Sequence, residues 1–139
     1  MGEDTFYIIV GKKCTGKTEL ALRLAKNIPR RKIVFCCTEE AKRKWTDIPG
    51  VEILSATVES VKNLLKEQEY KLSLKEPCET DVFIESCCCV LRDFIKSKEV
   101  RHLVLDRNCL HMNIRVIAQT LEQLPKIIRN SATSIQQTG

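Results

Sequence analysis

The fold class predicted from the sequence rests mainly on the segment Gly11-Lys12-Lys13-Cys14-Thr15-Gly16-Lys17-Thr18. It follows the apolar run from Phe6 to Val10, which is rich in β-branched residues and typical of a buried strand. Apolar residues then recur at helical spacing, namely Leu20, Ala21, Leu24, Ala25 and Ile28. Pro29 ends this pattern, so the segment is predicted to form a strand, a glycine loop and a helix.

The glycine loop has the composition of a phosphate-binding loop. Gly11 permits a sharp exit from the strand, and Gly16 lets the backbone approach phosphates at the positive end of the helix. Lys17 would reach the β- and γ-phosphates, and the Thr18 hydroxyl would bind Mg²⁺. The sequence therefore predicts a nucleoside-triphosphate site. Its binding residues are Gly11, Lys12, Lys13, Cys14, Thr15, Gly16, Lys17 and Thr18. The alternative is an ordinary glycine turn in an unrelated α/β domain.

Further apolar runs at 33–37, 51–54, 82–84 and 114–118 are predicted strands. Helical patterns separate them, beginning at Thr38, near Val58 and near Cys88, and the polar stretch 71–80 is predicted to be a loop. Alternating strands and helices favour a three-layer α/β fold, a mostly parallel central sheet with helices on both faces. With 139 residues, the expectation is a single domain over 1–139.

Composition narrows the function classes. The chain is 43% hydrophobic and 29% charged, and no apolar run is long enough to span a bilayer. Acidic residues at the start argue against a secretory signal, so an intracellular protein without a membrane or lipid anchor is expected. The eight cysteines lack the spacing of a disulfide framework or a zinc site, and reduced thiols are expected. The net charge of +5 permits phosphate or nucleic-acid contacts.

Two acidic residues compete to hold the metal from the end of a strand. Glu85 follows the run 82–84, and Asp106 follows Leu103 to Leu105. Seven residues separate Asp106 from the strand at Ile114, which is too short for a crossover between parallel strands. We therefore interpret Leu103 to Leu105 as the end of a helix that begins near Cys88. Glu85 is the predicted metal ligand, with Asp106 as the alternative.

Hydrolysis also needs a group that activates water. In such sites a second carboxylate commonly follows the metal-binding acid, but Ser86 stands there and is a poor base. Gln119, at the end of an otherwise apolar strand, would sense the γ-phosphate or orient the water. Its alternative role is a hydrogen bond at the strand end. The predicted catalytic residues are Lys17, Glu85 and Gln119, and the predicted metal ligands are Thr18 and Glu85.

Taken together, these segments resemble the genome-packaging ATPases of large DNA viruses, the poxvirus-type branch of the FtsK/HerA-like P-loop superfamily. The resemblance covers most of the chain. It includes the loop at 11–18, the Thr38-Glu39 turn and the strand at 82–87. Its most specific part is Ile114-Arg115-Val116-Ile117-Ala118-Gln119-Thr120, followed by Leu124-Pro125 and Ile128-Arg129-Asn130.

The resemblance implies an ATP- and Mg²⁺-dependent motor that works as a homo-oligomeric ring on double-stranded DNA. It gives Glu85 the role of the Walker B acid, Gln119 that of the sensor, and Arg129 a basic position of the family. Arg107 is the nearest candidate for an arginine supplied to a neighbour's γ-phosphate. The implied location is the cytoplasm or nucleus of an infected cell, or the virion. This chain departs from the family at Glu85-Ser86 and at Arg107-Asn108-Cys109, and it resembles a minimal or C-terminally truncated member.

Three functions are therefore considered. The first is an ATP-hydrolysing motor domain for packaging or translocating viral DNA. The second is a degenerate module that binds nucleotide without turnover, which Ser86 favours. The third is a small nucleotide kinase, against which the scattered basic residues argue because such enzymes need an arginine-rich lid.

Overall fold

The computed structural model describes residues 6–11, 16–36, 38–76, 78–85 and 91–138. Within these ranges, six strands alternate with helices. The strands are β1 (Phe6–Val10), β2 (Arg31–Cys36), β3 (Val51–Ser55), β4 (Thr80–Glu85), β5 (Met112–Ala118) and β6 (Ser134–Gln137). The helices are α1 (Lys17–Lys26), α2 (Glu39–Thr46), α3 (Val58–Ser73), α4 (Leu91–Lys96), α5 (Lys98–Leu105) and α6 (Lys126–Asn130), with a 3₁₀ turn η1 (Leu121–Gln123).

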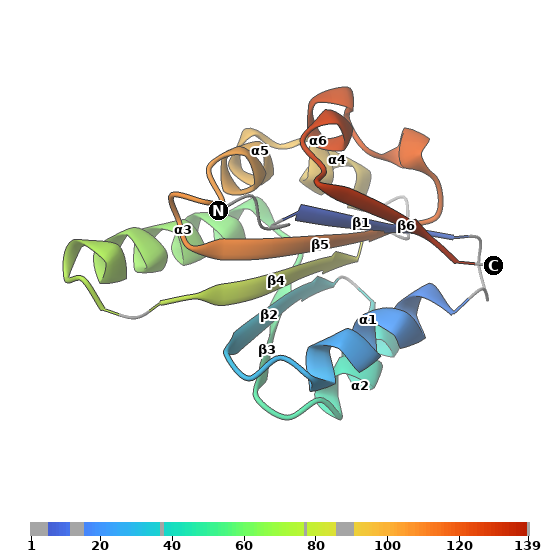
Figure 1. Cartoon of the computed structure of the whole chain (residues 1–139), viewed down its shortest axis with the longest axis horizontal. Coiled ribbons are helices and arrows are strands. Elements are labelled where there is room, and N and C mark those ends of the chain that lie inside the picture. Colours follow the sequence, from blue (N-terminus) through green and yellow to red (C-terminus); the bar gives the residue numbers. More distant parts are fainter. Residues whose placement is uncertain (1–5, 12–15, 37, 77, 86–90, 139) are drawn as a thin grey trace.

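The strands form one sheet in the order β3-β2-β4-β5-β1-β6, and every described pair is parallel. Helices α1 and α2 cover one face, and α3, α4, α5 and α6 cover the other (Figure 1). The expected three-layer α/β fold is confirmed. Two neighbours, β5 and β6, flank β1, so the strand before the glycine loop lies inside the sheet.

Local signals explain where several helices begin. The Thr38 side chain accepts a hydrogen bond from the Ala41 N–H, and Thr57 accepts one from Ser60. Each threonine satisfies a backbone donor that the first helical turn leaves free. The predicted start of a helix at Thr38 is confirmed. The helix predicted near Val58 begins at that residue.

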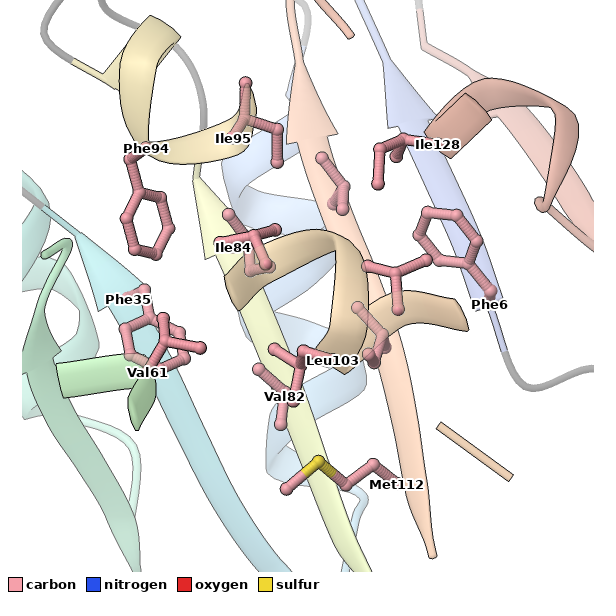
Figure 2. Packing of buried hydrophobic residues seen from close by; sticks show 14 of the residues in the cluster. Phe6, Phe35, Val61, Val82, Ile84, Phe94, Ile95, Leu103, Met112 and Ile128 are labelled. Carbon is pink, nitrogen blue, oxygen red and sulfur yellow. The ribbon is translucent and has the colours of Figure 1, made fainter. Parts of the chain in front are cut away.

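The core lies in two layers, one on each face of the sheet. On the face under α3, α4 and α5, inward residues of neighbouring strands pack together, including Phe6, Phe35, Val82, Ile84 and Met112 (Figure 2). The second layer lies between the sheet and α1 and α2, and contains Trp45, Ile48 and Phe83. Because successive strand residues point to opposite faces, Asp81, Phe83 and Glu85 of β4 share the face of α1 and α2.

Three expectations were inaccurate. The segment interpreted as one helix from near Cys88 to Leu105 contains two helices, because Ser97 has extended backbone angles and caps α5 through the Val100 N–H. Helix α3 runs to Ser73, three residues into the predicted loop. Strand β6 was not expected, because it is short and mostly exposed, and Ile135 is its one apolar residue, too few to form an apolar run or an alternation.

The described helices give no indication of a membrane span. The longest of them, α3, has 16 residues and carries charged side chains along its length. None of the helices in the described ranges combines the length and the apolar composition that crossing a bilayer requires.

Candidate functional site

The carboxyl ends of three central strands meet at one edge of the sheet, which we call the carboxyl edge. Val10 of β1 pairs with Ala118 of β5, and Ile117 of β5 pairs with Glu85 of β4. The Gly11 N–H donates to the Ala118 carbonyl at 3.1 Å, so the residue that opens the glycine loop is tied to the end of β5. In parallel α/β sheets, this edge is where ligands bind.

The described part of the glycine loop lies at the carboxyl edge. Gly16 precedes α1 with φ of 86°, a left-handed conformation that favours glycine, and its carbonyl accepts the first helical hydrogen bond from Leu20. Lys17 opens the helix and is 6% exposed, whereas Thr18 is half-buried. The predicted binding residues Lys12, Lys13, Cys14 and Thr15 lie outside the described residues.

Glu85 is buried at the end of β4, with 7% of its surface exposed. Its Oε1 accepts a hydrogen bond of 2.7 Å from the indole Nε1 of Trp45 on α2. The Trp45 ring packs against Phe83, with centroids 5.0 Å apart and planes tilted by 52°. The carboxylate is therefore held at the carboxyl edge by a neighbouring helix.

The pKa of Glu85 is raised above its ordinary value, mainly because burial penalises the charged carboxylate. The Trp45 hydrogen bond and the positive charges of Lys44 and Lys17 oppose this effect, and Glu19 adds to it. Lys17 and Glu85, predicted separately from the sequence, are thus close enough to interact electrostatically. The effect of burial on the Glu85 pKa is still larger than the opposing effects of these contacts.

This raised pKa predicts a specific dependence of stability on pH. A carboxyl group whose pKa is raised by folding stabilises the native state at low pH, and this contribution is lost as pH rises through the folded-state pKa. Relative to Glu85→Gln, the wild type should therefore lose free energy of unfolding as the pH rises through the weakly acidic range. Urea unfolding of both proteins, followed by circular dichroism at several pH values, measures the difference. A difference that does not change with pH would contradict the prediction.

Gln119 follows β5 directly and is half-buried at the carboxyl edge. Its backbone N–H donates to the Oε1 of Gln123 at 2.7 Å, and the same oxygen accepts a longer bond of 3.4 Å from the Thr120 N–H. This capping arrangement fixes the chain as it leaves β5. Sequence reasoning missed Gln123, although a Gln three residues after Thr120 is a recognisable capping signal.

Asp106 lies at the other end of the sheet. It follows α5, forms a 2.6 Å pair with His102, and precedes the start of β5 at Met112. With about 3.3 Å of rise per residue, the seven-residue strand separates the two ends by about 20 Å. Of the two competing acids, Glu85, and not Asp106, therefore lies at the carboxyl edge with Gly11 and Lys17.

Arg107 does not fit the role of an arginine offered to a neighbouring subunit. It is buried, and its guanidinium donates to the carbonyls of Val104 and Ser131 at 2.7 and 3.2 Å. It also lies over the ring of Phe6, at the start of β1. Because the side chain packs inside its own domain, this arrangement argues against that hypothesis. Arg129, the other basic position, is half-buried on α6.

Solved structures share this architecture. The chain aligns over 99% of its length with the cytoplasmic domain of EssC, with a TM-score of 0.73 and 13% identity. It aligns over 95% with B204, the DNA-packaging ATPase from Sulfolobus turreted icosahedral virus, with a TM-score of 0.71 and 12% identity. The same coverage is found for B204 of Sulfolobus turreted icosahedral virus 2 in complex with ATPγS, with a TM-score of 0.66 and 13% identity.

The fold is that of a P-loop ATPase domain. This chain spans about a third of the EssC chain (33%), and 74% and 72% of the two B204 chains. No family model and no curated protein matches the sequence. The likeness therefore rests on three-dimensional structure at low identity.

Trp45 is a further site residue that sequence reasoning did not identify. Ala41, Trp45 and Ile48 recur at helical spacing, which indicates that this side of α2 faces the sheet. That spacing does not reveal which strand residue the indole reaches. The contact with Glu85 depends on how α2 and β4 pack, over 40 residues of sequence separation.

Proposed function

We propose that this domain binds ATP with Mg²⁺ and hydrolyses it. The observation that carries the proposal is the arrangement at the carboxyl edge. Buried Lys17 at the start of α1 and buried Glu85 at the end of β4 lie close enough to influence each other. The predicted phosphate-binding lysine and the predicted metal ligand are thus near each other, although 68 positions separate them in the sequence.

The side-chain oxygens at this edge suit Mg²⁺, which prefers hard oxygen ligands. The Thr18 hydroxyl and the Glu85 carboxylate would hold the ion, and the Trp45 bond occupies only one of the two carboxylate oxygens. When bound, the ion would neutralise charge that develops on the phosphate oxygens. Lys17 would bind the phosphates, and the positive N-terminal end of α1 would favour their negative charge. Gln119 would orient the attacking water.

Replacement of Lys17 by Met tests nucleotide binding. The substitution keeps a linear apolar stem and removes the ammonium group, so we expect ATP affinity to fall about tenfold, as for loss of a charged hydrogen bond. Lys26→Met is the matched control, because Lys26 is an exposed residue at the other end of the same helix. Polarisation of a fluorescent ATP analogue measures both. Equal affinity of the two variants would count against the site.

The finer proposal is a motor for packaging or translocating viral DNA in a homo-oligomeric ring. It is supported by the resemblance of the segment 114–120 and by the likeness to B204, which is a DNA-packaging ATPase. The net charge of +5 suits a polyanionic partner. The test is phosphate release from ATP and Mg²⁺ with and without double-stranded DNA. DNA should raise the rate, and a rate insensitive to DNA at low salt would argue against this role.

The second candidate is a module that binds nucleotide without turnover, favoured by Ser86 in place of a second carboxylate. Ser86 lies outside the described residues. This alternative predicts ATP binding that is sensitive to Lys17→Met, together with no phosphate release above background. Multiple turnovers by the wild type would exclude it.

A further inference from the structure

Trp45 is the single tryptophan of the chain, and it is fully buried. Its ring packs against Phe83, and its N–H donates to Glu85, two residues further along β4. Both partners face α2 because their side chains point to the same side of the strand. Two contacts on one strand therefore fix both the plane of the indole and the direction of its N–H.

A buried indole N–H needs an acceptor, and a backbone carbonyl would satisfy it. Here the acceptor is instead the Glu85 carboxylate, at the end of β4 and near Lys17. An indole N–H can only donate, so it selects an accepting oxygen and holds the Glu85 side chain in one orientation. The hydrogen bond is short and buried, where such bonds are stronger than in water.

Resting on the proposed function, we infer that Trp45 is a positioning residue that acts through Glu85. Its N–H holds Oε1, so that the other carboxylate oxygen serves the metal that accompanies the nucleotide. Residues that hydrogen-bond to metal ligands commonly determine metal affinity in this way, and their removal typically lowers metal affinity or activity about 10- to 100-fold. Helix α2 thereby contributes to the site without contacting the nucleotide.

Trp45→Phe tests this inference, because it keeps an aromatic ring against Phe83 and removes the donor. Binding of a fluorescent ATP analogue is followed by polarisation, first in EDTA and then during titration with Mg²⁺. We expect nucleotide affinity in EDTA to change less than about twofold. The Mg²⁺ concentration that gives half of the Mg²⁺-dependent increase in nucleotide binding should rise about tenfold. A purely structural role would weaken binding equally in both conditions.

Ile48→Val is the matched control. Ile48 packs in the same layer beside α2 and makes no hydrogen bond through its side chain, so the variant loses packing but keeps the Trp45 bond. Its Mg²⁺ dependence should equal that of the wild type. If Trp45→Phe does not fold, incorporation of β-(3-benzothienyl)alanine at position 45 keeps the shape of the indole and removes the N–H. In a Glu85→Gln background, Trp45→Phe should cause no further change in Mg²⁺ dependence.

The outcomes separate the two proposals. Wild-type protein that binds no nucleotide overturns the proposed function and, with it, the role of Trp45. Suppose that the wild type shows Mg²⁺-dependent binding and that Trp45→Phe and the benzothienyl protein have the same Mg²⁺ dependence. This result overturns the positioning role alone. A selective rise in the Mg²⁺ requirement of both altered proteins supports it.

Discussion

Replacement of Glu85 by Gln is expected to lower the rate of phosphate release at least about 100-fold while leaving ATP affinity in EDTA nearly unchanged. The amide has nearly the shape of the carboxylate, and its oxygen can still accept the Trp45 N–H. What is lost is the negative charge that would hold the metal and the water at the carboxyl edge. Steady-state phosphate release and nucleotide polarisation on the same preparation separate turnover from binding.

Asp106→Asn is the control for this prediction. Asp106 is the other acid that the sequence proposed, and it lies near the start of β5 in a pair with His102. Its substitution should change phosphate release less than about twofold, as expected for a partly exposed group far from the chemistry. Normal hydrolysis in Glu85→Gln together with loss in Asp106→Asn would overturn the choice of Glu85.

The second large effect is expected at the opposite end of β4, where Asp81 is fully buried. Its Oδ2 accepts from Arg115 at 2.7 Å, and its Oδ1 accepts from Arg30. The Arg115 side chain is 13% exposed and lies over Tyr7. Asp81→Asn would leave the half-buried Arg115 guanidinium without its fully buried countercharge. We expect a loss of about 3 kcal/mol in the free energy of unfolding.

Chemical unfolding followed by circular dichroism measures this loss. Glu79→Gln serves as the control, because Glu79 is exposed and lies 4.0 Å from Arg30. An exposed pair of this kind contributes little, so its loss should cost less than about 0.5 kcal/mol. Similar losses in the two variants would show that burial of Asp81 does not determine the effect.

Local periodicity predicted much of this fold. Continuous apolar runs marked β1, β2, β4 and β5, because strands buried on both faces need no polar alternation. The loop length between Asp106 and β5 excluded a parallel crossover there, and helix α5 indeed ends at Leu105. Strand β6 was not predicted because a short, mostly exposed edge strand with a single apolar residue, Ile135, has no such signal.

Local sequence was enough to predict β1 and α1 on either side of the glycine loop, because these elements depend on residues close together in the chain. Three-dimensional packing was needed to show that Glu85 lies near Lys17, that Trp45 donates to it, and that Arg107 is buried within its own domain. These facts depend on strand order, register and helix packing. Such contacts join residues tens of positions apart, and a local pattern carries no information about which distant partner a side chain meets.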